Sequence, residues 1–372
     1  MDATSKYGGR LHEFCDFVLG SLHRTDQRRS GEVYIRGLLH CQGRRSTRNI
    51  AAQIGGCSDQ SLQQFVNQSP WDPQPVRQRL AAVLTAWVQL NAWVLDEVAF
   101  DKHGQQSVAV ERQFVPSAGR VRNCQLGAVA MLVSDECAVA VDWRLFVPRS
   151  WDTDTDRRRT TRLPDDQRHR PFWRCQVDLV DDLCGDWGLP QAPVVLDARH
   201  CRTPDQLVAE LDSRGVDYVV RLTAAHAAQL RLAPSLTQRP ARRVTVSWQP
   251  PARANPVRAQ FAHLTAPTAR RSMLVEWQLG TASPRAYWLT NLNDRPIDEL
   301  VGLVKLMQRA RHELDQLTTS VGLGHHEGRS YAGWHHHVTL ASAAHCFQLL
   351  DGLCDPEQST VPEDVRKAQS LR

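Results

Sequence analysis

Apolar residues in the first ninety positions recur at the spacing of α-helices. In LHEFCDFVLGSL (11–22) and EVYIRGLLHCQ (32–42), apolar side chains fall at i, i+3, i+4 and i+7. This spacing gathers them on one face of a helix, which can then pack against a core. We therefore predict that residues 9–90 are helical.

Residues 44–72 predict two short helices joined at Gly55-Gly56, because two adjacent glycines interrupt the helical pattern. Serine, threonine and aspartate are favoured caps at helix N-termini. The cap candidates are Ser46 or Thr47 for a helix that ends at Gln53, and Ser58 or Asp59 for one that ends at Val66.

A basic cluster lies at the entrance to the first of these helices. It consists of Arg44, Arg45 and Arg48, which we expect to point outward. Two short helices around a glycine turn, with arginines beside them, are typical of a DNA-binding helix-turn-helix. An ordinary helical hairpin with a solvated basic end fits the same pattern.

From Trp93 the pattern changes to the short apolar runs of strands. AWVLDEVAF carries Asp96 in its middle, and a turn, SDE, joins the runs 125–133 and 137–147 as antiparallel strands. Residues 151–171 read as a charged loop, because no apolar period is present. The other expected elements are a helix over 172–187, strands over 192–200 and 216–222, β-like pieces within 223–290, and helices over about 297–321 and 334–350.

These elements predict an α/β protein with a divided core. We expect a helical N-terminal domain over 1–90 and the first part of an α/β core over 91–222. A β-rich insertion over 223–290, the C-terminal part of the core over 291–350 and a tail over 351–372 complete the chain.

Composition excludes several classes of protein. The 372 residues are 42% hydrophobic and 23% charged, with a net charge of +5, which is typical of a globular protein and not of a disordered one. The longest apolar run, 126–133, is far shorter than the ~20 residues of a membrane span. The N-terminus has no apolar segment of a secretory signal, so we expect a cytoplasmic protein without a membrane partner. Ten cysteines without a CxxC pair suggest buried thiols.

Two aspartates, Asp96 and Asp197, are expected at the ends of apolar strands, Asp96 after AWVL and Asp197 after APVVL. A carboxylate there is costly unless it is paired or binds a metal. Carboxylates on two adjacent strands would form the oxygen-rich site that Mg²⁺ prefers, and two-metal phosphoryl transfer uses such a site. The alternative is that each aspartate caps a neighbouring turn.

Seven longer segments carry a family resemblance. They are VYIRGLL, NQSPWD, VLDEVAFDKHGQQSVAVERQF, AGRVRNCQLG, DWRLFVPRSWD, VVLDARH and GLGHHEGRSYAGWHHHVTL. In this order they resemble the insertion-sequence-701 family of transposases, over about residues 30–350. The resemblance implies the DDE class, with an RNase H-like mixed sheet flanked by helices, a helical DNA-binding N-terminus and a β-rich insertion. It also implies that Asp96 is the first catalytic acid and Asp197 the second.

The chain departs from this family at the third acid, a glutamate on the long helix. An ungapped alignment from GLGHHEGRS backwards puts Arg311 at that glutamate. The tryptophan, isoleucine and lysine of the family pattern are replaced as well, by Gln308, Ala310 and Thr318.

The arginine is expected to pair with Asp96 and Asp197, because a guanidinium and a carboxylate form bidentate contacts. Asp315 lies one turn later on the same helix face, about 6 Å further along the axis. It is therefore a poor replacement for the missing glutamate, since a misplacement of about 1 Å can cost ~100-fold in rate.

Three hypotheses for function remain open. The first is a transposase relic or domesticated DNA-binding protein without strand-transfer chemistry. The second is an active transposase that uses Asp315 and Mg²⁺. The third is an enzyme that acts on a small molecule with Asp96, Asp197 and Arg311, since fold does not determine function. DNA is the expected partner, a homodimer is conceivable, and Mg²⁺ is expected as cofactor only for an active site.

Two further groups of residues are expected to be structural. The histidines 325–326 and 335–337 resemble a metal cluster, but the second run belongs to the family's GWHHH pattern and packing is the expected role. Trp143, Trp173, Trp187 and Trp288 are expected in the core. GxSxG, Walker A, GxGxxG and HExxH motifs are all missing, so the enzyme classes that use them have no support.

Overall fold

The computed structural model describes residues 3–185, 187–229, 242–251, 255–265 and 270–354. The larger part of the expected tail, 355–372, lies outside the described residues. No helix in the described ranges combines the length and the apolar character needed to cross a bilayer. None of the nine cysteines with a described side chain forms a disulfide.

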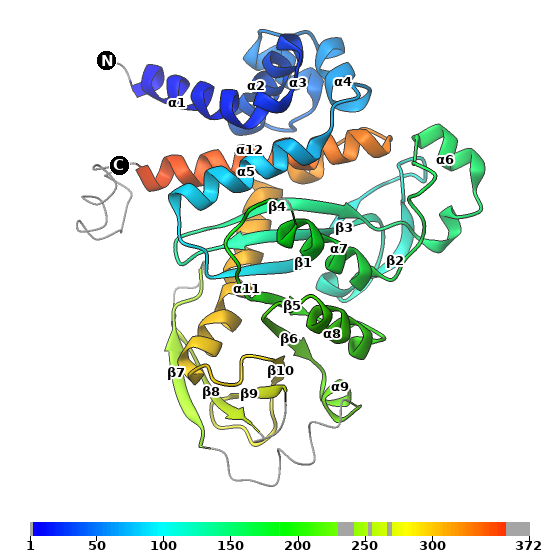
Figure 1. Cartoon of the computed structure of the whole chain (residues 1–372). Coiled ribbons are helices and arrows are strands. Elements are labelled where there is room, and N and C mark those ends of the chain that lie inside the picture. The colour runs from blue at the N-terminus through cyan, green and yellow to red at the C-terminus, as the bar shows by residue number, and fades with distance from the viewer. Residues whose placement is uncertain (1–2, 186, 230–241, 252–254, 266–269, 355–372) are drawn as a thin grey trace.

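The N-terminal part is helical, as predicted. Five α-helices lie above the sheet in Figure 1: α1 (Ala3–Val18), α2 (Thr25–His40), α3 (Thr47–Ile54), α4 (Asp59–Asn67) and α5 (Pro73–Trp87). A short 3-10 helix, Leu19–Ser21, follows α1. Helices α1, α2, α4 and α5 all contact the closing helix α12 (Tyr331–Cys354). The closing helix therefore joins the N-terminal helices to the rest of the molecule.

The predicted helix pair around Gly55-Gly56 is confirmed. Ser46 caps α3, because its Oγ accepts a hydrogen bond from Asn49 N at 3.3 Å, and Ser58 caps α4 in the same way. Both glycines have a positive φ, of 72° and 80°, a backbone conformation that residues other than glycine rarely adopt.

Five strands form the sheet on which the candidate site lies, in the order β4-β3-β1-β5-β6. β3 runs antiparallel to both β1 and β4, whereas β5 and β6 run parallel to β1. This order and these directions are those of an RNase H-like sheet, and the fold class is as predicted. The bounds are β1 Ala92–Asp101, β3 Arg120–Val133, β4 Ala138–Leu145, β5 Val194–Asp197 and β6 Tyr218–Leu222.

The β-rich segment extends this same sheet. β10 (Ala286–Thr290) pairs antiparallel with β6, and the order continues through β9 (Ser272–Gln278), β8 (Val257–Leu264) and β7 (Val244–Trp248). At the other edge, β2 (Glu111–Val115) and the short 3-10 turn Pro116–Ala118 form a hairpin with the first residues of β3. The sequence did not predict β2, which has only five residues, or β8, whose apolar positions are interrupted by Arg258, Gln260 and His263.

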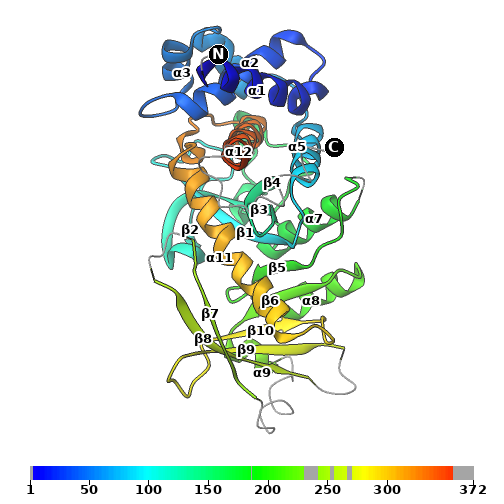
Figure 2. The same ribbon diagram turned by 90° about the vertical axis from the view of Figure 1, so that its left-hand side faces the viewer.

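Helices cover the two faces of the sheet. The long helix α11 (Ile297–Thr319) contacts β1, β3, β4, β5 and β6, and Figure 2 shows it on the opposite side from α7 (Phe172–Cys184) and α8 (Pro204–Ser213). A short helix, α9 (Ala224–Gln229), follows β6.

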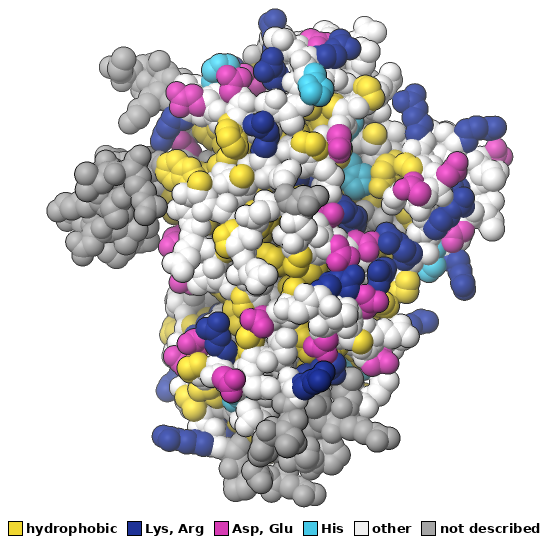
Figure 3. Space-filling view, in the orientation of Figure 1, with side chains coloured by type: hydrophobic (Ala, Val, Ile, Leu, Met, Phe, Trp, Pro, Cys, Tyr) yellow, Lys and Arg dark blue, Asp and Glu magenta, His cyan; other side chains and the backbone are white. Residues whose placement is uncertain are grey.

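On the α7–α8 side, basic and acidic side chains lie interspersed (Figure 3). Arg174 pairs with Glu210 at 2.9 Å, and Arg170 with Asp178 at 2.7 Å. Acidic and basic side chains on this face therefore form ion pairs with one another.

The prediction of a structureless loop over 151–171 is wrong. Arg149–Trp151 form a 3-10 turn, and α6 spans Thr155–Thr161. The segment lacks an apolar period because its anchor is a buried arginine. Arg158 is 5% exposed, and its guanidinium donates to the carbonyl oxygens of Pro164 (2.7 Å) and Gln167 (3.0 Å).

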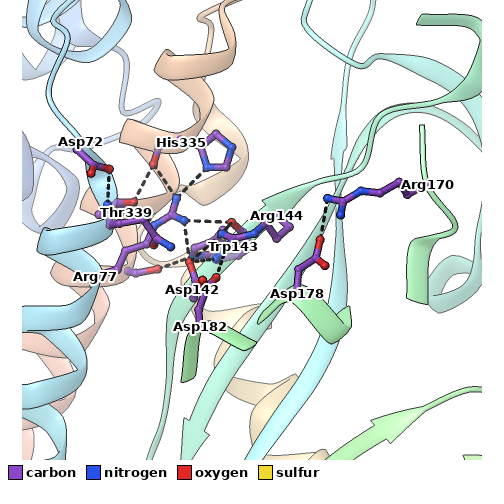
Figure 4. Close-up of polar contacts among 12 residues, drawn as sticks. Asp72, Arg77, Asp142, Trp143, Arg144, Arg170, Asp178, Asp182, His335 and Thr339 are labelled. Carbon is purple, nitrogen blue, oxygen red and sulfur yellow. Dashed lines mark hydrogen bonds and ion pairs between the residues drawn. The ribbon is translucent and has the colours of Figure 1, made fainter. Parts of the chain in front are cut away.

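A buried polar network joins three parts of the fold (Figure 4). Arg77 on α5 is 1% exposed and donates from Nη1 to Asp142 Oδ1 on β4 at 2.8 Å, and from Nε to Thr339 Oγ1 on α12 at 2.7 Å. Its Nη2 lies 2.9 Å from His335 Nδ1. A buried charge is stable only when it is paired in this way, so the network fixes how α5 and α12 sit on the sheet.

Candidate active site

The candidate site lies where β1 and β5 run side by side. Leu95 and Leu196 are register partners in this parallel pair, so the next residues, Asp96 and Asp197, are neighbours. Asp197 ends β5, as predicted. Contrary to the expectation for the acid pair, Asp96 does not end its strand but lies in the middle of the run AWVLDEVAF, because β1 continues to Asp101. Asp96 therefore projects from mid-strand, beside the point where β5 ends.

Arg311 on α11 bridges the two aspartates. Its Nε donates to Asp96 Oδ2 at 3.0 Å, and its Nη2 donates to Asp197 Oδ2 at 3.3 Å. The predicted pairing is thus present. The carboxylates are almost buried, with side-chain exposures of 9% and 11%, whereas Arg311 keeps 40%.

Two more arginines hold Asp197, and the sequence analysis missed both. Arg199 donates from Nε to Asp197 Oδ1 at 2.9 Å and from Nη2 to Oδ2 at 2.8 Å, and its backbone N–H reaches Oδ1 at 3.2 Å. Arg221, on the neighbouring strand β6, places Nη1 3.6 Å from Asp197 Oδ2. Asp96, Asp197, Arg199, Arg221 and Arg311 are called the arginine–aspartate cluster below.

A sequence signal for Arg221 existed, because an arginine inside the apolar run VDYVVRL needs a buried partner. Arg199 follows Asp197 by two residues, and a turn there brings the two side chains together.

The surroundings of Asp197 and Arg311 favour the ionised forms of these two side chains. Burial alone would raise the pKa of the Asp197 carboxyl, but the hydrogen bonds and charge of Arg199, helped by Arg221, outweigh it and lower the pKa. Burial opposes the charge of Arg311, yet Asp96 and Asp197 raise its pKa above the ordinary value. Among these five residues, three guanidinium groups face two carboxylates, and Glu97 and the buried Glu276 are further acidic groups that act on Arg311 and Arg221.

The β2–β3 hairpin closes one side of the site. Glu97, next to Asp96, accepts a hydrogen bond from Ser117 N at 2.7 Å, and burial raises the pKa of Glu97 to about 7. The ring of Phe114 lies 5.5 Å from the ring of His200, which directly follows Arg199. The hairpin therefore contacts both β1 and the turn after β5.

The donor set does not fit a pair of divalent metal ions. All four carboxylate oxygens of Asp96 and Asp197 already accept hydrogen bonds: Asp96 Oδ1 from Glu97 N at 2.9 Å, and the other three from arginine groups. Mg²⁺ needs several free oxygen ligands in near-octahedral geometry. Within the described ranges, no group of three or more His, Cys, Asp or Glu side chains could hold a metal ion.

Other residues of α11 do not complete an acidic site. Asp315, the expected substitute acid, is exposed, and no contact joins it to the cluster. Glu313 points away from the cluster and lies 3.2 Å from His345 Nε2 on α12. Gln308 accepts a hydrogen bond from Trp248 Nε1 at 3.2 Å, Ala310 is buried, and Thr318 donates to Leu314 O at 2.8 Å.

The histidine runs are mostly packed inside, as expected. His326, His335, His336 and His337 are all less than 9% exposed, whereas His325 is half-buried. His337 contacts Tyr34 Oη (2.9 Å) and Leu323 O (2.8 Å). Trp143 and Trp288 are core residues, but Trp173 and Trp187 are only half-buried at its margin.

The predicted outward position of the basic cluster is correct for two of its three arginines. Arg48 is exposed, and Arg44 is 62% exposed although its Nε lies 3.1 Å from Glu327. Arg45 is half-buried, because its Nε donates to Leu38 O at 2.8 Å. Arg45 therefore anchors the segment between α2 and α3, and its outward placement was wrong.

The sequence of the chain matches a known protein family. A family model described as "DDE superfamily endonuclease" matches residues 18–284. This range includes Asp96 and Asp197 but ends before α11 and Arg311. Among curated proteins, none matches the chain significantly. Since the match covers well over half of the chain and agrees with the RNase H-like sheet, the chain belongs to the DDE superfamily endonuclease family.

Proposed function

We propose that this chain is a transposase-like DNA-binding protein that carries out no metal-dependent cleavage or strand transfer. The observation that carries the proposal is the occupation of every carboxylate oxygen of Asp96 and Asp197 by hydrogen-bond donors. In this proposal Asp96 and Asp197 are the first two acids of a DDE site, and Arg311 stands where the third acid belongs. The insertion-sequence-701 family is the proposed origin.

The charges of the cluster are the reason why we propose that metal-dependent cleavage and strand transfer are lost. Two-metal catalysis requires that carboxylates neutralise two divalent ions, which then activate the attacking oxygen and stabilise the leaving oxygen. The arginine–aspartate cluster has an excess of positive charge before any metal arrives. A metal ion would have to displace Arg199 and Arg311 from hydrogen bonds of 2.8–3.3 Å. Asp315 offers no rescue, since it lies a helical turn away and faces solvent.

Calorimetric titration with Mn²⁺ tests the absence of a metal site. We expect no tight binding by the native chain. Arg311→Glu alone should restore little Mn²⁺ binding, because Arg199 still donates hydrogen bonds to both oxygens of Asp197. The double variant Arg199→Ala with Arg311→Glu should bind Mn²⁺ more tightly. Tight binding by the native chain that disappears in Asp197→Ala would contradict the proposal.

The matched control for this experiment is Arg24→Ala. Arg24 makes the same kind of bidentate pair with Asp26, two residues away, at 3.0 and 2.7 Å, but on the surface at the start of α2. Its loss should leave Mn²⁺ binding unchanged.

The DNA-binding half of the proposal rests on α3, α4 and the exposed Arg48. Contacts with phosphates release counterions, so affinity for duplex DNA should fall steeply with salt. Arg48→Gln should lower the slope of log affinity against log salt by about 1, whereas Arg24→Gln should not change it. Affinity that does not depend on salt, or no binding at low salt, would contradict this half alone. Absence of DNA binding by the chain would favour the small-molecule hypothesis.

A further inference from the structure

We propose that the arginine–aspartate cluster binds a phosphate group of a nucleic acid strand directly, without a metal ion. The inference rests on the proposed function, because it assigns a ligand to the site that no longer holds metals. The juxtaposition that supports it is an excess of guanidinium groups at a partly open site, next to an exposed aromatic pair.

The cluster has unused hydrogen-bond donors. A guanidinium carries five N–H groups, but Arg199 and Arg311 use only Nε and Nη2 toward the aspartates. Neither Nη1 donates to any residue in the described ranges. The two side chains are 37% and 40% exposed, so their free edges can reach a ligand from solvent.

Arg221, the third arginine of the cluster, adds positive charge from β6. Arg221 is 15% exposed, and its Nε is buried without a hydrogen-bond partner among the described residues. Burial lowers the pKa of Arg221, and the neighbouring Arg199 lowers it further, whereas Asp197 raises it. A phosphate oxyanion at the mouth of the site would neutralise the excess charge that these arginines create. Arginine is well suited to this, because its planar fork matches phosphate geometry.

The surroundings favour a polynucleotide over a free phosphate ion. Phe114 is 48% exposed, and its ring packs 5.5 Å from that of His200, which is also exposed. Val121, the register partner of Phe114 on β3, is 54% exposed. Single-stranded nucleic acids bind where a positive groove follows the backbone and aromatic rings stack with bases. A base next to the bound phosphate would meet Phe114 and His200.

The arrangement predicts an effect opposite to that of a metal site. Asp197 competes with the ligand for Arg199 and Arg311, so removing its charge should free donors and strengthen phosphate binding. A metal-bridged phosphate would instead be lost with Asp197, because the metal needs its carboxylate. Asp197→Asn, which preserves the shape of the side chain, therefore distinguishes the two.

The experiment measures binding by calorimetry and ³¹P NMR in EDTA. The probes are inorganic phosphate, a 5′-phosphorylated thymidine tetranucleotide and the same tetranucleotide without its 5′-phosphate, which keeps only the internal phosphodiesters. Both oligonucleotides are too short to require the α3–α4 region. We expect the phosphorylated oligonucleotide to bind most tightly. Arg199→Gln and Arg311→Gln should each weaken it about tenfold, Asp197→Asn should strengthen it, and Arg24→Gln should have no effect.

The outcomes separate the inference from the proposed function. Phe114→Ala should weaken binding of the phosphorylated oligonucleotide and leave the affinity for inorganic phosphate unchanged. Equal affinity of the native chain for the phosphorylated oligonucleotide and for inorganic phosphate would overturn the nucleic acid assignment. No binding of any phosphate probe, binding that requires Mg²⁺, or weaker binding by Asp197→Asn would overturn the inference. Failure of this kind leaves the Mn²⁺ and duplex DNA tests untouched, whereas cleavage of the oligonucleotide with Mg²⁺ would overturn the proposed function itself.

Discussion

Replacing Arg77 by methionine should destabilise the whole molecule. The side chain is 1% exposed, and its partner Asp142 is 0% exposed. Without the guanidinium, Asp142 Oδ1 keeps only the hydrogen bond from Trp143 N at 2.8 Å, and Oδ2 has no partner already. Methionine fills a similar volume, so the main cost is an uncompensated buried charge and not a cavity.

The expected loss follows from the contacts of the network. Breaking a buried ion pair by removing one partner costs about 3–5 kcal/mol. Arg144 Nη1 lies 3.6 Å from Asp142 Oδ1 and can compensate in part, whereas His335 and Thr339 also lose a donor. We therefore expect a loss in unfolding free energy of about 3 kcal/mol, the lower end of that range.

Urea-induced unfolding followed by tryptophan fluorescence measures this loss. The control is Arg36→Met, since Arg36 pairs with Glu32 on the surface of α2 at 2.6 Å with 39% exposure, and such pairs contribute under about 1 kcal/mol. The double variant Arg77→Met with Asp142→Leu should regain part of the stability, because neither charge remains. A loss below about 1 kcal/mol in Arg77→Met, or a double variant that loses the sum of the two single losses, would refute the reasoning.

Three further predictions concern stability elsewhere. Burial lowers the pKa of His337 to about 4, so between pH 6.5 and 4 the unfolded chain binds a proton that the native chain does not, and stability falls with decreasing pH. The unfolding free energy from urea curves should therefore depend on pH less steeply in His337→Leu than in the native chain, by about 1 kcal/mol per pH unit. A Cβ on Gly37 would lie 2.4 Å from Ile50 Cγ2, so Gly37→Ala should cost about 1–3 kcal/mol of unfolding free energy through overpacking and lower the melting temperature. Ile50→Ala in the same chain should recover part of this loss. Ser58→Ala removes the cap of α4 and should cost about 1 kcal/mol in urea unfolding; a change within error would argue against the cap.

Much of the fold could be predicted because its longest elements have strong periods. The helix predicted over 297–321 is Ile297–Thr319, and the antiparallel strands joined by the turn at Ser134 are β3 and β4. The elements that were missed lack such periods. β2 has only five residues, the apolar positions of β8 are interrupted by polar ones, and α6 is held by the buried Arg158.

The candidate site could be predicted only in part. Apolar strands that carry Asp96 and Asp197 indicated an acid pair, and the family alignment indicated Arg311. The contacts of Arg199 and Arg221 depend on a turn and on the pairing of β5 with β6, which local pattern does not define. An arginine within an apolar segment, such as Arg221 in VDYVVRL, is the signal that a buried partner lies elsewhere in the chain.

The packing of α12 has a consequence for how the protein is made. Tyr34 on α2 bonds His337 on α12 across 303 positions of sequence, and α12 also contacts α5 and β4. As the nascent chain leaves the ribosome, every other described element emerges before this helix does. Until then, the parts of α2 and α5 that pack against α12 lack this partner, although α2 can already contact α3 and α5 can already contact β4. Exposed apolar faces of this kind attract chaperones and promote aggregation. Synthesis in the cell should therefore depend on chaperone capacity up to the moment when α12 is released.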